Sequence, residues 1–204
     1  TLDVNGTLDL AGSTMTGFTI PSGQTLTVAS GATITNSGTD TGFGEDNTPA
    51  FLVLVDGHQT GVSEGVVTKV EFNEAIYDTD SAFDTSTNYR FTVPSGKAGK
   101  YYFYGSMFIQ TDGGGKTIEG GEPRIRVNGT DRWAFTINQE SKYRYWCYTL
   151  GPISLDLSVA DYVEVMGYVV TSDSGGVSFV SGGSYSGGSW YLRTYFGGYK
   201  LPGV

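Results

Sequence analysis

Apolar and polar residues alternate at every second position in segment after segment, and this period of two restricts the fold more than any other feature. In Val66 to Asn73, for example, Val66, Val70 and Phe72 share one side. Side chains alternate between two faces in a β-strand, whereas a helix needs apolar residues three and four positions apart. No segment keeps that helical spacing over the roughly ten residues that a helix requires. The sequence therefore predicts an all-β fold.

Residues 1–44 repeat a short unit that ends in glycine. Successive units are 1–6 (TLDVNG), 7–12 (TLDLAG), 25–31 (TLTVASG) and 32–38 (ATITNSG). Each unit has the pattern of a short strand closed by a turn, which is typical of fibre shafts and β-solenoids. A segment of about 45 residues without disulfides or metal buries too little apolar surface to fold alone. We therefore expect a β-repeat stalk that winds with two copies of itself or docks on a neighbour, and a flexible linker is the alternative.

The alternation is lost before Pro49, where glycine, aspartate, asparagine and proline gather. This composition is typical of loops, so we place a linker at residues 45–49 and a head at residues 50–204. In the head, Phe51 to Val55 has the pattern of a buried strand. The pair Asn128 and Gly129 favours a tight hairpin, because both residue types tolerate positive φ. Short strands and turns at this spacing indicate a β-sandwich.

The first half of the head contains a series of spaced aromatic residues. Phe72, Asp78 and Phe83 come first, followed by Phe91 and the segment 99–103 (GKYYF). This series resembles the signature of the complement C-one-q globular domain, which belongs to the tumour-necrosis-factor-like jelly-roll superfamily.

Two later segments extend the same resemblance. Residues 157–165 (LSVADYVEV) are similar to the family's strand Leu-x-x-Gly-Asp-x-Val-x-Leu, with Ala160 in place of glycine. Residues 194–201 (TYFGGYKL) are similar to its closing strand. The pieces occur in the family's order and span about residues 50–201.

The resemblance implies a non-enzymatic jelly-roll head that forms a homotrimer on a trimeric stalk and binds partners at its outer surface. It also implies that the following residues lie in the core or at the trimer interface: Phe72, Phe83, Phe91, Tyr101, Phe103, Phe196 and Tyr199. In animal members the stalk is collagen-like, but this sequence has no Gly-X-Y run. A β-repeat stalk before a trimeric head is similar instead to bacteriophage tail fibres.

The formal net charge of −9 excludes several classes of partner. It repels phosphate backbones and anionic lipids, so we expect no nucleic-acid binding and no role at a membrane surface. No apolar run reaches the roughly 18 residues of a membrane span, so we expect no membrane insertion. Cys147 is the single cysteine, which rules out an intrachain disulfide. Because Thr1 is not a methionine, we expect a fragment or a processed product.

The chain contains 14 Tyr, 11 Phe and 3 Trp, more rings than one small sandwich needs inside. Two interpretations are open: core and trimer interface, or a platform for a receptor or glycan. Residues 142–148 (KYRYWCY) mix cations with rings, and 181–190 (SGGSYSGGSW) have the composition of an adaptable loop. The candidate binding residues are therefore Tyr143, Arg144, Trp146, Tyr185 and Trp190.

Asp78, Asp80 and Asp84 form an acidic cluster between strands. Clustered carboxylates suit calcium, and some members of the resembled family bind it. The two interpretations are a calcium site and a solvated turn. We expect no other cofactor.

Candidates for catalysis are few. His58 is the single histidine and occupies a turn, 56–59 (DGHQ), where a solvated side chain is the simpler interpretation. Residues 113–117 (GGGKT) imitate the end of a phosphate loop, but Gln110 stands where the full motif has glycine. Among the 21 acidic residues, nothing selects the carboxylate pair of a glycoside hydrolase.

Three hypotheses follow. The first is a non-enzymatic, trimeric virion appendage similar to a phage tail fibre. Its head binds a host-surface glycan or protein, and its N-terminal side attaches to other virion proteins. The second is a secreted, complement-like adhesion or lectin module of a cell. The third is an enzyme that degrades surface polysaccharide.

Overall fold

The computed structural model describes residues 47–112, 115–172, 176–181, 183, 184, 190, 191 and 194–202, with isolated positions between 22 and 31. At 139–142, 183, 184, 190 and 191 it describes the backbone alone. The chain divides into two units, Thr1–Asp40 and Thr41–Val204. The expected stalk lies almost entirely outside the described residues, so the stalk and the domain boundaries stay predictions.

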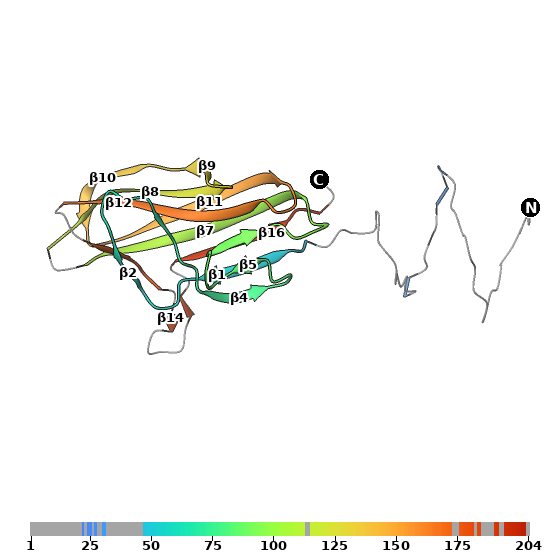
Figure 1. Ribbon diagram of the computed structural model, residues 1–204, viewed down its shortest axis with the longest axis horizontal. Coiled ribbons are helices and arrows are strands. Elements are labelled where there is room, and N and C mark those ends of the chain that lie inside the picture. The colour runs from blue at the N-terminus through green and yellow to red at the C-terminus, as the bar shows by residue number, and fades with distance from the viewer. Residues whose placement is uncertain are drawn as a thin grey trace, which may run out of the picture. The chain divides into compact units, whose positions relative to one another are not determined.

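The head is a sandwich of two β-sheets, which confirms the all-β prediction (Figure 1). Sheet A contains β1 (Ala50–Leu54), β2 (Gln59–Val62), β4 (Glu74–Asp78), β7 (Gly99–Thr111), β11 (Tyr145–Leu157), β13 (Val177–Phe179) and β16 (Tyr195–Lys200). Sheet B contains β3 (Thr68–Lys69), β5 (Phe83–Asp84), β6 (Arg90–Thr92), β8 (Ile118–Val127), β9 (Thr130–Ala134), β10 (Ile137–Tyr143) and β12 (Tyr162–Thr171). A separate two-stranded sheet contains β14 (Gly183–Ser184) and β15 (Trp190–Tyr191). In the described part of the chain, no helix has the length and apolarity that crossing a bilayer needs.

Strand β7 is the centre of sheet A. One of its edges pairs with β11, and its other edge pairs first with β16 and then with β13. Beyond β16 come β1 and β4, and beyond β13 comes β2. In sheet B, β12 pairs with β8 on one edge and with β6 and β3 on the other. All of these pairings are antiparallel, as in a jelly roll.

The turn between β8 and β9 has the geometry that its residues predicted. Asn128 and Gly129 both have positive φ, 51° and 76°, and Val127 pairs with Thr130 across the turn. The expected hairpin is therefore confirmed.

The core between the two sheets is rich in aromatic rings. Phe103 stacks on Phe196 with 5.7 Å between ring centroids, and Phe51 stacks on Phe91 at 5.0 Å. This core buries most of the residues expected in the core or at a trimer interface: Phe72, Phe83, Phe91, Tyr101, Phe103 and Phe196. Tyr199 differs, because it lies on the other face of sheet A.

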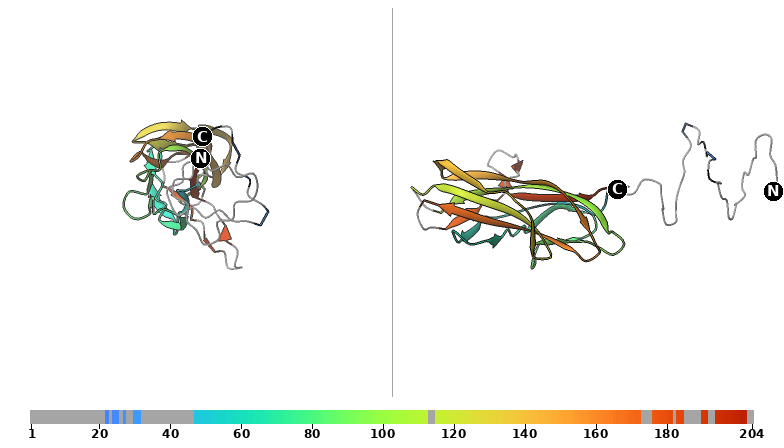
Figure 2. Two further views of the ribbon diagram at one scale, coloured as in Figure 1. Left: turned by 90° about the vertical axis from the view of Figure 1, so that its right-hand side faces the viewer. Right: turned by 90° about the horizontal axis from the view of Figure 1, so that it is seen from above.

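The described head begins and ends at the same place, which we call the entry end. Ala50 pairs with Tyr199, and the backbone N–H of Lys200 donates to the carbonyl of Pro49 at 3.1 Å. The far end lies opposite, where β7 stops and β11 starts. There the backbone N–H of Thr111 donates to the carbonyl of Arg144 at 3.1 Å. The right-hand view of Figure 2 shows long strands running between the two ends.

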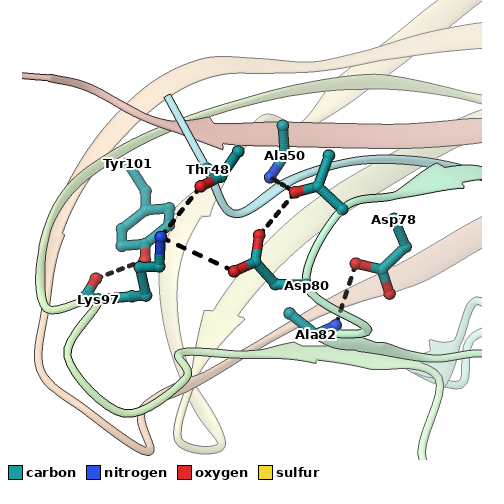
Figure 3. A network of polar contacts seen from close by, with 8 residues as sticks. Thr48, Ala50, Asp78, Asp80, Ala82, Lys97 and Tyr101 are labelled. Atoms are coloured by element: carbon teal, nitrogen blue, oxygen red, sulfur yellow. Dashed lines mark hydrogen bonds and ion pairs between the residues drawn. The ribbon is translucent and has the colours of Figure 1, made fainter. Parts of the chain in front are cut away.

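Lys97 fixes the start of the head at the entry end (Figure 3). Its Nζ donates to Thr48 Oγ1 at 3.0 Å and lies 3.8 Å from Asp80 Oδ1. Its carbonyl accepts a hydrogen bond from the Tyr101 hydroxyl at 2.5 Å. The segment that leads into β1 is thus attached to the β4–β5 turn and, through Tyr101, to the core.

Candidate functional site

The face of sheet A that points away from the core carries a group of tyrosines. Alternation along β7 buries Tyr101 and Phe103 and leaves Tyr102 and Tyr104 partly exposed on the opposite face. Strands β4 and β16 add further tyrosines to this face. We call the group the tyrosine belt: Tyr77, Tyr102, Tyr104, Tyr195 and Tyr199.

Most of the rings of the belt touch one another. Tyr102 lies 5.5 Å from Tyr199 and 6.3 Å from Tyr104, measured between ring centroids. Tyr104 lies 6.5 Å from Tyr195 in an edge-to-face arrangement. These distances fall in the range of about 4.5–7 Å that favours aromatic pairs. The belt is thus a continuous aromatic surface that crosses neighbouring strands.

Gly197 lets this surface lie close to the sheet. A Cβ atom at position 197 would be 2.7 Å from Tyr104 Cζ, so the ring occupies the space of the missing side chain. Burial, and then a hydrogen bond with Tyr77, raise the pKa of Tyr104 to about 12. The Tyr104 phenol is therefore neutral at physiological pH.

An uncharged aromatic sheet face that stays partly exposed is typical of the centre of a protein interface. Tyr77 is 43% exposed in the single chain. Of the belt tyrosines, only Tyr199 was among the residues expected in the core or at the trimer interface. The segment 101–104 (YYFY) contained the missing signal, because aromatics at consecutive positions must point to both faces of a strand.

A second aromatic group lies at the far end. Tyr143, the last residue of β10, stacks on Trp146 of β11 with 5.9 Å between centroids and 23° between ring planes. The guanidinium of Arg144, between the two strands, lies 5.4 Å from the ring centroid of Tyr145. We call Tyr143, Arg144, Tyr145 and Trp146 the far-end cluster.

The far-end cluster brings together three of the five residues predicted to bind a receptor or glycan. They are Tyr143, Arg144 and Trp146, and their role in binding stays a prediction. Trp190 lies in β15, and its side chain is not described. Tyr185 lies outside the described residues.

Tyr145 of the far-end cluster lies on the outer face of sheet A, as the belt does. Tyr145 lies 6.3 Å from Phe108, which follows Tyr102 and Tyr104 along the outer side of β7. Cys147, the single cysteine, is exposed and pairs with Phe108 in the strand register. Aromatic residues thus lie on this face both in the belt and near the far end, with Ser106 between Tyr104 and Phe108 on β7.

The three aspartates considered for calcium bond to different groups. Asp78 accepts hydrogen bonds from the backbone N–H groups of Ala82 and Phe83, at 3.0 and 2.8 Å. Asp80 accepts one from the hydroxyl of Thr79 at 2.7 Å and faces Lys97.

Asp84 closes its own turn. It accepts bonds from the backbone N–H groups of Ser86, Thr87 and Asn88, which hold the pKa of its carboxyl far below the usual range. Across the described residues, no group of three or more His, Cys, Asp or Glu side chains is arranged to hold a metal. The solvated-turn interpretation fits these contacts, and we propose no calcium site.

His58 lies on the surface, where its Nδ1 is 3.1 Å from Ser181 Oγ. Both side chains are solvent-accessible, and within the described part of the chain no carboxylate bonds to the other ring nitrogen. The pair thus lacks the third group that orients the base in a hydrolytic triad.

Comparison with known proteins finds no matching family model and no matching curated sequence. Solved structures do match. Eiger TNF from S. frugiperda has 10% sequence identity and a TM-score of 0.51, covering 76% of this chain and 93% of its own. The globular domain of zebrafish complement 1qA protein has 18% identity and a TM-score of 0.46, covering 76% of this chain and 98% of its own. Murine APRIL has 13% identity and a TM-score of 0.44, covering 74% and 98%. The head therefore has the tumour-necrosis-factor-like jelly-roll fold that its spaced aromatics predicted.

Proposed function

We propose that this chain is a non-enzymatic, homotrimeric binding module whose head presents a receptor-binding surface on a fibre. The observation that carries the proposal is the tyrosine belt. It is aromatic and partly exposed, and the ring of Tyr104 packs against the backbone of Gly197 and the edge of Tyr195. Burying this face against other copies removes it from water, and cyclic symmetry is the usual way in which identical chains do so.

Three copies are favoured over two by the sequence. The resemblance to the complement C-one-q family implies trimers, and the repeats of residues 1–44 need partner chains to bury their few apolar residues. A trimeric stalk joined to a trimeric head satisfies both requirements at once.

The trimer is tested by light scattering on the full chain. We expect three times the chain mass of 21.8 kDa. Tyr102→Arg and Tyr199→Arg place a cation inside the buried belt, so each should weaken the trimer and lower the average mass, with an unchanged β-sheet circular dichroism spectrum. The matched control is Tyr168→Arg on the outer side of β12 in sheet B, which should stay trimeric. A single-chain mass for the unaltered protein would remove the proposal.

We place the module on a virion, as the head of a tail fibre or similar appendage that binds a host-surface glycan or protein. The glycine-closed repeats before the head support this location, and the N-terminal side would attach to other virion proteins. The alternative is a secreted, complement-like adhesion module. Gold-labelled antibodies against the head, viewed by electron microscopy, should label an appendage of the particles. Labelling confined to the fluid around producing cells would favour the secreted module.

A further inference from the structure

We propose that Asn128 is a deamidation site that the fold keeps from reacting, and that its conversion permanently breaks a contact between two turns. One turn joins β8 to β9 at residues 127–130, and the other joins β11 to β12 at residues 158–161. Both lie at the entry end, where Leu157 pairs with Gly99 at the start of β7. The reaction needs water alone, so this inference does not depend on the proposed trimer.

Asn128 and Gly129 form the dipeptide that deamidates most readily. The backbone nitrogen of Gly129 attacks Cγ of Asn128 and forms a new C–N bond. The bond from Cγ to the side-chain nitrogen breaks, and that nitrogen leaves as ammonia with the proton of the attacking N–H. Water then opens the resulting succinimide ring to aspartate or isoaspartate. Glycine favours the attack, because no Cβ at position 129 hinders the nitrogen. Both residues are exposed, so water reaches the site.

The fold holds the side-chain amide of Asn128 at both ends. Asn128 Nδ2 donates to Asp161 Oδ1 at 2.7 Å, and Asn128 Oδ1 accepts from the backbone N–H of Tyr162 at 3.0 Å. We call these two hydrogen bonds the turn lock. Attack on Cγ makes that carbon tetrahedral and closes a five-membered ring, so the amide must first leave the turn lock. The closed lock should therefore suppress the reaction.

Asp161 is a fixed acceptor in the turn lock. Its Oδ2 accepts from the backbone N–H of Ser158 at 2.8 Å, which closes the 158–161 turn. The hydrogen bond from Asn128, followed by the one from Ser158, lowers the pKa of Asp161 below its ordinary value. The carboxylate is thus ionised at neutral pH, and the hydrogen bond that it accepts from Asn128 is charge-assisted.

Deamidation would replace this attraction with repulsion. An ionised aspartate at position 128 has no N–H to donate, and its carboxylate would face Asp161 Oδ1 across the present 2.7 Å. Two carboxylates so close disfavour each other's ionised forms. Isoaspartate also adds a carbon to the backbone of the turn. Neither product restores the lock, so a chain that has reacted stays open at this point.

Peptide-mapping mass spectrometry of the full chain, incubated at mildly alkaline pH, measures the reaction. The reference is the same chain unfolded in guanidinium chloride. We expect Asn128 to convert at least about tenfold more slowly in the folded chain, because the lock must open first. Equal rates in the two states would overturn the protection by the fold. No conversion in the unfolded chain would overturn the deamidation site itself.

Variants test the part played by Asp161. Asp161→Ala removes the acceptor, and Asp161→Asn has one acceptor oxygen for two donors, so each should speed the conversion of Asn128 in the folded chain at least about fivefold. Two controls should leave the rate unchanged: Asp156→Ala, which removes an exposed carboxylate of β11, and Tyr101→Phe, which weakens the core. An unchanged rate in Asp161→Ala, or an equal increase in Tyr101→Phe, would overturn the lock.

Exchanging the two side chains tests the consequence. Asn128→Asp should lower the thermal unfolding midpoint at neutral pH by about 2–4 °C. The double variant Asn128→Asp with Asp161→Asn again pairs one amide with one carboxylate, so it should recover most of that loss. If Asn128→Asp is as stable as the unaltered chain, or if the double variant is less stable still, deamidation does not act through this contact.

Discussion

Tyr104 lies against the backbone of Gly197 so closely that a Cβ atom at position 197 would be 2.7 Å from Tyr104 Cζ and 2.8 Å from its hydroxyl oxygen. The two residues are register partners on β7 and β16. The arrangement of the belt therefore depends on a residue without a side chain as much as on its tyrosines.

Gly197→Ala should displace the ring of Tyr104 and disrupt the belt. We expect a loss of about 1–3 kcal/mol in the free energy of unfolding, the usual cost of overpacking. The displaced ring belongs to the proposed interface, so the trimer should also be weaker. In analytical ultracentrifugation, the protein concentration below which the trimer dissociates should be higher than for the unaltered chain.

The double variant Tyr104→Ala with Gly197→Ala is the control, because the methyl group then has room. Its unfolding free energy should match that of Tyr104→Ala alone within about 0.5 kcal/mol. If the double variant is less stable than Tyr104→Ala by as much as Gly197→Ala is less stable than the unaltered chain, the clash with the Tyr104 ring is not the cause of the loss.

Tyr104 should make stability fall at alkaline pH. Its pKa in the folded chain is about 12, above the ordinary 10.0, chiefly because of burial. The folded chain thus holds the phenol proton more tightly than the unfolded chain. The resulting stability is complete below pH 10 and is lost as the pH rises through 12.

Denaturant unfolding at several values between pH 9 and pH 12 measures this decline. Tyr101 adds to it, since burial raises its pKa to about 12 as well. Tyr104→Phe should therefore decline less steeply than the unaltered chain, and its tyrosinate absorbance should lack one late-titrating group. Identical slopes for the two proteins would contradict the prediction.

Tyr101 and Tyr148 form a matched pair for testing buried hydroxyls. Both side chains are fully buried, but only the Tyr101 hydroxyl has a partner, the carbonyl of Lys97. The Tyr148 hydroxyl has no partner among the described residues. Tyr101→Phe should cost about 1–2 kcal/mol of unfolding free energy, whereas Tyr148→Phe should be neutral or add up to about 1 kcal/mol. Equal losses in urea denaturation would mean that Tyr148 has an undetected partner.

The sequence predicted the sandwich because its signals are local. Phe51 to Val55 was expected as a buried strand, and β1 covers Ala50–Leu54. The pattern from Val66 to Asn73 correctly marked Val70 and Phe72 as buried. However, only Thr68–Lys69 pairs as a strand there, and Val66 is 51% exposed. Periodicity identifies a face, but hydrogen bonding depends on where the neighbouring strand runs.

The surfaces were predicted unevenly for a related reason. Tyr143, Arg144 and Trp146 are neighbours in the sequence, so their proximity could be predicted. The alternation in residues 101–104 places Tyr102 and Tyr104 on the outer face, but no local pattern predicts that Tyr77 and Tyr195 lie on that face too. The acidic cluster differs, because its aspartates bond to separate groups. Asp78 and Asp84 accept from backbone N–H groups of their own turns, and Asp80 accepts from Thr79 and faces Lys97. Proximity along a loop does not aim carboxylates at one point.

Ala160 stands where the resembled family has glycine, and its backbone shows why glycine suits the position. Its φ is +69°, in the left-handed region. A side chain there costs about 1–2 kcal/mol, partly offset by the greater flexibility that glycine gives the unfolded chain. Ala160→Gly should therefore raise the free energy of unfolding by about 0.5–1 kcal/mol. Gly65 is the matched control, because its φ is also +69° and an added Cβ would meet nothing within 4 Å. Gly65→Ala should lower the unfolding free energy by a similar amount in the same urea titration. If both changes shift stability in the same direction, backbone strain is not what separates them.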